Sequence, residues 1–435
     1  MLQSSQLSNG GQHSMVRFNR MFISATIIAL TLFTLIACLA PAGTNAAISQ
    51  TAHPSKVFMP IAITPPLFGV LQPDTQRQTT ALQAGLRART LEIGWNLYEP
   101  REGTWNTAYM EQQKKLAAQM RAAGFSVILD LGVQNPPDWV VALPNSRFVN
   151  QYGDTFQAGL GINGVNAIFN GAVRDHIARY TQRVFADLGT NFYAVRIGMG
   201  TYNELMYPDT NYNGHANSYW AFDPIAQGQV SGLPFGVKSA PNPGWLPGTP
   251  SVDHQAAADF ANWYIDSLHN FHDWQVSMLR PVYPGKLMML YPSWGLRPAQ
   301  LQTAIAGDLN GTTSPEVNGE VQRGLDFARF VGGIGDPNVV LYTTWLDAPD
   351  RGDSGTNQAE WSPARYLAAL AAANPLSLGV WGENSGHNSY ADMQRCIRQA
   401  YANKFQGVLW AFERDLYSDT YATLGEYKAL INGTP

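Results

Sequence analysis

Short apolar runs alternate with longer segments of helical periodicity over most of this chain. Three of the longer segments, 110–123, 257–279 and 363–373, carry apolar residues at the spacing of an amphipathic helix. Eight apolar runs have the length of buried strands, near 57–63, 89–95, 125–131, 192–198, 286–291, 338–343, 376–381 and 407–412. Repeated strand–helix alternation predicts a parallel sheet, and eight units are enough to close it into a (β/α)8 barrel, a TIM barrel.

An open, doubly wound α/β sheet is the main alternative fold. It is disfavoured because no G-x-G-x-x-G turn follows the first predicted strand. Barrels of this length are commonly one unit, so we expect a single barrel domain over residues 55–433 of the 435-residue chain.

The N-terminal segment is typical of an export signal. Arg17 and Arg20 precede an uncharged, mostly apolar stretch over 21–40. Leu35-Ile36-Ala37-Cys38 fits a lipobox, which predicts lipidation of Cys38; cleavage after Ala46 and an uncleaved anchor helix are the alternatives. Each version makes 1–46 a signal or anchor with a tether. We therefore expect an extracytoplasmic protein, secreted or lipid-anchored, that meets the membrane only through this segment.

Composition narrows the possible partners. Charged residues make up 14% of the chain, the net charge is −4 and no basic stripe is visible, which argues against nucleic acid. The only other cysteine, Cys396, leaves no cysteine cluster for zinc. His269 and His272 share one helix face without a carboxylate-rich pattern nearby, so we read them as ordinary helix residues. No metal or organic cofactor is expected.

Two glutamates follow predicted strands and point to chemistry. Glu204 comes after the fourth apolar run and Glu383 after the seventh, at the barrel edge where such enzymes hold their catalytic groups. Paired carboxylates suit cleavage of a glycosidic bond, with one acid protonating the leaving oxygen. Facing carboxylates also push their pKa values apart. The long loops over 132–170 and 205–255 are expected to form the substrate cleft.

A family resemblance becomes specific around the second strand. Residues 89–105 resemble the Arg-x-x-Glu-x-x-Trp…Glu-Pro-x-x-Gly segment of glycoside hydrolase family 42, the β-galactosidase family of the clan A retaining glycosidases. Residues 135–139 resemble its Pro-Pro-x-Trp loop, and 170–186 and 260–275 resemble two of its helices. The chain departs from the family at Tyr202, where an aspartate is usual, and in lacking the zinc-binding cysteines.

This resemblance implies a retaining enzyme acting on a β-linked oligosaccharide or polysaccharide, with a β-galactoside as one candidate. Glu204 would be the acid/base and Glu383 the nucleophile. Arg89 and Asn203 would hold the sugar in the first subsite, with Trp410 as the aromatic floor beneath it. Further candidates for sugar contacts are Trp95, Tyr291 and Trp381, and Asp130 ends the third strand.

A second resemblance leads to an alternative mechanism. Residues 198–208 are similar to the Gly-x-Gly-Pro-x-Gly-Glu-Leu-x-Tyr-Pro segment of β-amylases, and 382–384 are similar to the segment around their catalytic base. β-Amylases are inverting barrel enzymes that use the same two strand ends. Asn203, where β-amylases have glycine, favours the retaining clan. A non-catalytic, surface-tethered glycan-binding barrel is the third alternative. Sugar identity, endo- or exo-action and oligomeric state stay open.

Overall fold

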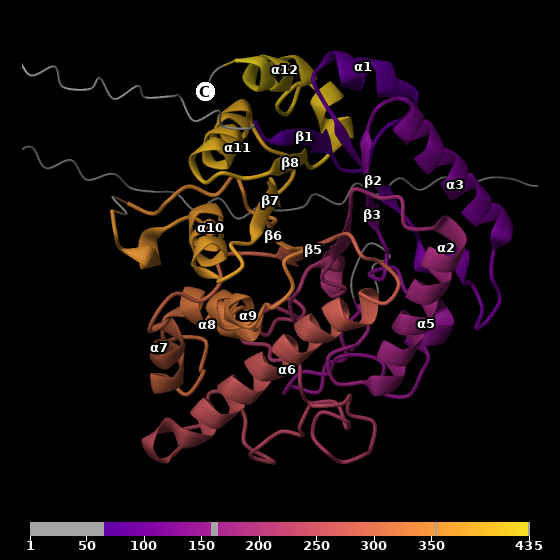
Figure 1. Ribbon diagram of the computed structural model, residues 1–435. Coiled ribbons are helices and arrows are strands. Elements are labelled where there is room, and N and C mark those ends of the chain that lie inside the picture. Colours follow the sequence, from indigo (N-terminus) through magenta and orange to yellow (C-terminus); the bar gives the residue numbers. More distant parts are fainter. Residues whose placement is uncertain (1–64, 158–163, 353–354, 434–435) are drawn as a thin grey trace, which may run out of the picture. The chain divides into compact units, whose positions relative to one another are not determined.

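The computed structural model describes residues 65–157, 164–352 and 355–433 (Figure 1). Eight parallel strands form a closed barrel in which each strand pairs with the next and the last pairs with the first. The predicted (β/α)8 barrel is confirmed. The strands are β1 (Leu67–Val70), β2 (Ala88–Glu92), β3 (Ser126–Asp130), β4 (Ala194–Ile197), β5 (Lys286–Tyr291), β6 (Val339–Thr343), β7 (Gly379–Glu383) and β8 (Gly407–Trp410).

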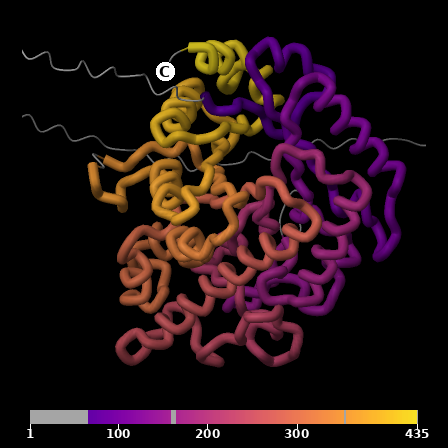
Figure 2. The backbone as a smooth tube through the Cα atoms, viewed as in Figure 1, coloured from indigo at the N-terminus to yellow at the C-terminus, as the bar shows by residue number. Residues whose placement is uncertain are grey.

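The first strand is not the one that the apolar pattern suggested. The run at 57–63 lies outside the described residues, and β1 follows Pro65 and Pro66 instead. This strand pairs with β2 on one side and β8 on the other. Figure 2 accordingly shows the first described elements beside the last ones. A four-residue strand is too short to stand out from sequence periodicity beside a longer apolar run.

The predicted helices match the structure closely. They are α3 (Thr107–Ala122), α6 (Gln255–Leu279) and α10 (Pro363–Ala373), together with α5 (Gly171–Leu188) in the segment from 170 to 186. Asn170 caps α5 by accepting a hydrogen bond from the Val173 amide. The other helices are η1 (Thr75–Arg77), α1 (Gln78–Gln83), α2 (Trp95–Tyr98), α4 (Asp138–Val141), η2 (Thr201–Asn203), η3 (Val252–His254), α7 (Gln300–Ala306), α8 (Pro315–Gln322), α9 (Phe327–Gly332), η4 (Gln358–Glu360), α11 (Tyr390–Ala402), η5 (Glu413–Tyr417) and α12 (Leu424–Asn432).

Successive side chains of each strand point alternately into and out of the barrel. The inward set forms one apolar cluster, which includes Ala88, Ile128, Ala194, Met288, Val340, Trp381 and Leu409. The outward set packs beneath the helices in a second, larger cluster. The next inward side chain of a strand comes two residues after one of these apolar positions and lies nearer the carboxyl end of the strand. These later inward positions carry several polar groups of the site.

The long segment over 205–251 folds back against α6. The Tyr219 ring meets Phe260 edge-on at 5.6 Å, and the Trp220 amide donates to the Tyr264 hydroxyl at 3.0 Å. The segment is therefore anchored by buried aromatic contacts on one helix. No helix within the described residues is long and apolar enough to cross a bilayer. The predicted signal and Cys38 lie outside the described residues.

Candidate active site

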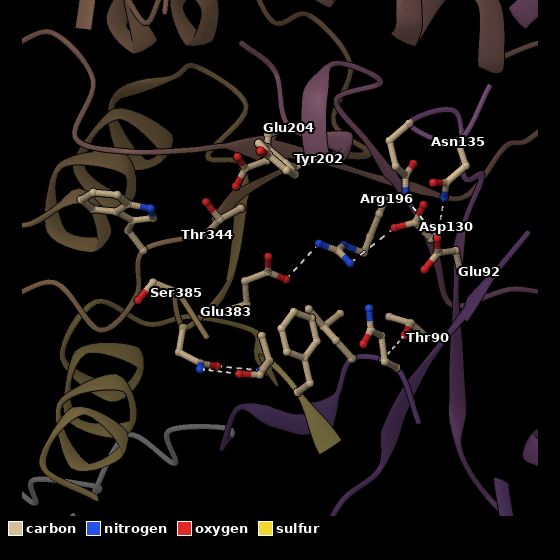
Figure 3. Close-up of a pocket in the computed structure, with 17 residues that line it drawn as sticks. Thr90, Glu92, Asp130, Asn135, Arg196, Tyr202, Glu204, Thr344, Glu383 and Ser385 are labelled. Carbon is tan, nitrogen blue, oxygen red and sulfur yellow. Dashed lines mark hydrogen bonds and ion pairs between the residues drawn. The ribbon is translucent and has the colours of Figure 1, made fainter. Parts of the chain in front are cut away.

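A pocket of about 540 Å³ opens at the carboxyl ends of the strands. This volume lies in the range usual for small-molecule sites, ~300–1,000 Å³. Figure 3 shows side chains from several strands converging on it. Its lining consists of Leu71, Gln72, Thr90, Glu92, Asp130, Gln134, Asn135, Arg196, Tyr202, Glu204, Thr344, Trp345, Glu383, Asn384, Ser385, Ala411 and Phe412. Both predicted glutamates are among these residues.

One arginine joins the acidic groups of the pocket. Glu92, Asp130 and Arg196 are partners in register on the adjacent strands β2, β3 and β4. Arg196 Nη2 donates to Glu383 Oε2 at 2.9 Å, and Nη1 donates to Asp130 Oδ2 at 3.4 Å. The guanidinium is nearly buried, and it supplies the only positive charge among the described lining residues. It therefore balances carboxylates on opposite sides of the pocket (Figure 3).

Glu383 is held by two donors at the end of β7. Its Oε2 accepts from Arg196 and, at 2.7 Å, from the Tyr342 hydroxyl on β6. Burial raises the pKa of Glu383, while the Arg196 charge and the Tyr342 hydrogen bond oppose the rise. Hydrogen bonds from a cation and a hydroxyl favour the ionised carboxylate. The site thus fixes the orientation of Glu383 and stabilises its negative charge.

Glu204 is positioned by a tight reversal of the chain after β4. Tyr202 and Asn203 have left-handed backbone, with φ of 60° and 62°. The chain returns so closely that a Cβ on Gly198 would lie 2.2 Å from the Asn203 carbonyl oxygen, and one on Gly200 would lie 2.3 Å from that of Glu204. Only glycine tolerates such an approach. Non-glycine residues in this conformation are uncommon and concentrate at functional sites.

The environment of Glu204 differs from that of Glu383. Burial raises the pKa of Glu204 to about 7, the Thr344 hydroxyl opposes this rise, and the Glu383 charge adds to it. No cation donates to the Glu204 carboxyl within the described residues. Near neutral pH this group therefore keeps a proton for much of the time, whereas Glu383 has a guanidinium to balance its charge. Such a division is typical of an acid paired with a nucleophile or base.

A third carboxyl group faces the same cavity. Burial within the pocket and the Asp130 charge raise the pKa of Glu92 to about 7, against the effects of Arg196 and Asn135. Glu92 Oε1 accepts from Gln134 Nε2 at 3.2 Å and from Asn135 Nδ2 at 3.1 Å. This wall of the pocket is rich in acceptors and amide donors, which suits contacts with hydroxyl groups.

Asn203 and Arg89 do not line the pocket. The Asn203 amide donates to Asp130 Oδ2 at 3.0 Å, and its oxygen accepts from the Met199 amide at 3.2 Å. Arg89 points out of the barrel, where it is fully buried and pairs with Glu413 at 2.8 Å. Asn203 therefore supports Asp130 from behind, and Arg89 joins β2 to the segment after β8. Neither side chain is among the lining residues of this pocket, so the sugar contacts that the resemblance implied stay predictions.

The four aromatic candidates also lie outside the pocket. Trp410 is on the outward face of β8 and packs against Tyr427 at 5.7 Å. Trp381 points inward, but one layer below Glu383, within the apolar interior. Trp95 stacks on Tyr180 at 5.1 Å, and the Tyr291 hydroxyl contacts His272 at 2.9 Å. Strand alternation explains the position of Trp410, because inward and outward faces change at every residue, whereas Trp381 is on the inward face but too deep to reach the pocket. The aromatic lining is instead formed by Tyr202, Trp345 and Phe412.

The long loops contribute little to the pocket. The segment over 132–170 provides Gln134 and Asn135, and the segment over 205–255 provides none of the described lining residues. The walls come from short stretches directly after the strands. Of the two loops expected to form the cleft, only the one over 132–170 contributes described residues to this pocket.

Arg196, Glu92 and Thr344 line the pocket but are not among the site residues predicted from the sequence. A signal for Arg196 was present, because it is the only charged residue of the apolar strand β4, and charged side chains are seldom buried unless they are paired. Glu92 ends a strand that also contains Arg89 and Thr90, so it stands out less. Counting inward positions along β2, β3 and β4 would have placed Glu92, Asp130 and Arg196 on one level. Thr344 offers no comparable signal.

Comparisons with known proteins support the fold. No protein-family model matches the chain, and no curated protein matches it. Among solved structures, the chain is similar to the catalytic domain of a β-amylase from Paenibacillus polymyxa, with 14% identity and a TM-score of 0.61, covering 85% of this chain and 100% of that one.

β-Galactosidases are also among the similar structures. The enzyme from the haloarchaeon Halorubrum lacusprofundi has 14% identity and a TM-score of 0.52, and the alignment covers 84% of this chain. The enzyme from Bacillus circulans sp. alkalophilus has 12% identity and a TM-score of 0.53, also with 84% of this chain covered. The chain spans 57% and 55% of these two proteins, respectively. At such identities the likeness establishes the barrel fold.

Proposed function

We propose that this protein is a glycoside hydrolase in which Glu204 and Glu383 cleave an O-glycosidic bond. The observation that carries the proposal is the pairing of two carboxyl groups with opposite electrostatic environments in one pocket. Glu204 has a pKa of about 7 because of burial, and Glu383 is bound by Arg196 and Tyr342. Glycosidases require one carboxyl that donates a proton and another that acts as a carboxylate.

Glu204 is the acid in this mechanism. It protonates the glycosidic oxygen as the bond to the anomeric carbon breaks, and Glu383 acts on the opposite face of the sugar. Arg196 limits the charge that Glu383 imposes on the pocket. The polar wall formed by Glu92, Asp130 and Asn135 accepts hydrogen bonds from sugar hydroxyls, and Trp345 and Phe412 offer apolar faces for the ring.

We propose retention of the anomeric configuration and a β-linked substrate, such as a β-galactoside. Two hydrogen bonds on a single oxygen fix Glu383 as an oriented carboxylate, which suits direct attack on the anomeric carbon. The sequence resemblance and the β-galactosidase structures support this version. The β-amylase likeness, which covers that whole catalytic domain, favours a second version in which Glu383 activates water and the configuration inverts.

The test uses the full chain and the variants Glu204→Gln and Glu383→Gln. Each should lower turnover of the accepted substrate by about a hundredfold or more, with an unchanged circular dichroism spectrum. Glu320→Gln serves as the matched control, because Glu320 is a buried glutamate outside the pocket that accepts from Ser293 and the Gly295 amide. Wild-type turnover in either pocket variant contradicts the proposal.

Substrate and stereochemistry are read in the same experiment. The panel contains aryl β-galactosides, aryl β-glucosides and malto-oligosaccharides, and proton NMR identifies the anomer that forms first. A β product from a β-glycoside supports retention, whereas a β product from an α-linked malto-oligosaccharide supports the inverting version. Saturable sugar binding without turnover would support the glycan-binding barrel instead.

We also propose that the protein works outside the cytoplasm. The basic residues before the apolar stretch at 21–40 and the cysteine at position 38 carry this proposal. Cell fractionation with metabolic labelling by a fatty-acid analogue tests it. Label should be lost in Cys38→Ser if Cys38 is lipidated. Activity confined to the cytoplasmic fraction contradicts export.

A further inference from the structure

A second polar cluster lies on α6, away from the pocket. His269, His272 and Asp273 each offer one ligand atom, and these atoms all lie within 4.8 Å of one another. His272 Nδ1 is 2.8 Å from Asp273 Oδ1, and His269 Nε2 is 3.7 Å from Asp273 Oδ2. Tetrahedral coordination with bonds of about 2 Å requires ligand atoms roughly 3.3 Å apart. The two distances, each to a different oxygen of the Asp273 carboxylate, lie within about 0.5 Å of this value.

The ring of His272 is already oriented for such a role. Its side chain is almost fully buried, and its Nε2 lies 2.9 Å from the Tyr291 hydroxyl on β5. Nδ1 is within hydrogen-bond distance of Asp273, so an ion bound there would take the place of the Nδ1 proton; with its proton on Nε2, the ring then donates to the Tyr291 hydroxyl. A hydrogen bond from the distal nitrogen to an outer group is the usual way in which proteins fix the tautomer of a metal-binding histidine.

His269 supplies an independent observation. Its Nε2 is shielded from solvent and has no hydrogen-bond partner among the described residues. The ring packs against Phe330 with centroids 5.3 Å apart. A shielded ring nitrogen without a hydrogen-bond partner among the described residues calls for an explanation, because buried polar atoms of this kind are uncommon.

The cluster differs from the other histidine–aspartate contacts. His215 lies 3.8 Å from Asp154, His254 lies 3.1 Å from Asp308 and His387 lies 3.1 Å from Asp415, but each of these pairs contains a single histidine. Within the described ranges, the cluster on α6 is the one group of three such ligands. From the sequence, His269 and His272 are interpreted as ordinary helix residues because no carboxylate-rich pattern accompanies them; in the structure the single carboxylate of Asp273, directly after His272, lies beside both rings.

We propose that His269 Nε2, His272 Nδ1 and the Asp273 carboxylate bind a divalent transition-metal ion of the Zn²⁺ class. Two imidazoles and one carboxylate are a common donor set for Zn²⁺, Ni²⁺ and Cu²⁺. The Asp273 side chain is 58% exposed, so solvent reaches the site and water completes the coordination. Through His272 and Tyr291, the ion would join the outer helix α6 to strand β5 and stabilise their packing.

Isothermal titration of the chelator-treated full chain with ZnCl₂ tests this proposal. The wild type should bind one ion that is lost in His269→Ala and Asp273→Asn. Loss of the outer hydrogen bond in Tyr291→Phe should weaken affinity by about tenfold or more. His215→Ala is the control and should bind as the wild type does. Melting curves without metal establish that each variant is folded, and Asp273→Asn keeps the shape of the side chain.

Several outcomes overturn the proposal. These are no saturable binding at millimolar Zn²⁺, wild-type affinity in either His269→Ala or Asp273→Asn, or loss of binding in the His215→Ala control. A rise in melting temperature with Zn²⁺ that disappears in both ligand variants supports the proposed link between α6 and β5. Glycosidase activity is not needed for any of these measurements, so they stand apart from the proposed function.

Discussion

Replacing Arg196 by methionine should separate the charge of this side chain from its packing. The guanidinium is 2.9 Å from Glu383 and 3.4 Å from Asp130 at its nearest atoms, and it is 7% exposed. Unit charges with centres 4 Å apart attract by about 4 kcal/mol at an effective dielectric constant of 20. Arg196→Met removes this attraction and leaves Glu383 and Asp130 without a cation. Methionine keeps much of the apolar stem.

Loss of the cation should raise the pKa of Glu383 further and lower activity near neutral pH. If the whole attraction stabilises the ionised form of Glu383, its loss of about 4 kcal/mol should lower kcat/KM about a thousandfold at pH 6. The acidic limb of the pH–rate profile should move to higher pH, because ionisation of Glu383 becomes harder. Activity should then recover partly as the pH rises. The assay is kcat/KM from pH 4 to 9 on the substrate found in the panel.

Two further variants act as controls. Arg196→Lys keeps the charge but replaces a planar group that reaches two carboxylates by a point charge. This variant should therefore be more active than Arg196→Met, and the acidic limb of its pH–rate profile should lie close to that of the wild type. Arg89→Met removes a buried arginine that pairs with Glu413 outside the pocket, so it should lower stability without moving the limb. A folded Arg196→Met enzyme with the wild-type pH profile would refute the reasoning.

Three other predictions follow from the same structure. The pKa of Glu204 is raised from 4.5 to about 7 in the folded protein. Between these pH values the unfolded chain releases the proton first, so the free energy of unfolding falls as the pH rises, by up to about 3 kcal/mol. Glu204→Gln should therefore melt above the wild type at pH 8 and match it at pH 4 in calorimetric scans. Trp345→Ala should raise KM because Trp345 lines the pocket. Trp410→Phe should lower the melting temperature and leave KM unchanged, because Trp410 packs against Tyr427 outside the pocket. A raised KM in Trp410→Phe with an unchanged KM in Trp345→Ala would instead support Trp410 as the floor of the site. Gly407→Ala places a Cβ 2.3 Å from the Trp381 ring and should cost about 1–3 kcal/mol in chemical denaturation, and an unaltered midpoint would contradict this.

The sequence predicted the barrel well because barrel strands are apolar on both faces. Seven of the eight apolar runs overlap strands of the structure, and three helical segments match almost residue for residue. The exception is β1, where a four-residue strand follows two prolines. Length and composition identify long buried runs, but they do not choose between two nearby apolar runs. That choice depends on pairing with β2 and β8, which are distant in the chain.

The site was only partly predictable, for a related reason. Glu204 and Glu383 stand out because they follow apolar runs. Arg89 and Trp410 carried the right residue types for sugar contacts, yet each points out of the barrel. A one-residue change of position along a strand reverses its face, and similarity between short motifs does not fix the register to that accuracy. The structure supplies this register directly.

Several acidic side chains share one cation in the pocket. Glu92, Asp130, Glu204 and Glu383 all line it, while Arg196 is the single cation among its described residues. Arg196 donates to Asp130 and Glu383. Burial raises the pKa values of Glu92 and Glu204 to about 7, and the Arg196 charge opposes this rise without a direct hydrogen bond to either group. Burial thus favours a proton on Glu204, whereas the Arg196 and Tyr342 hydrogen bonds favour the ionised form of Glu383. Under the proposed function, this difference in environment is what would set the acid apart from the nucleophile or base.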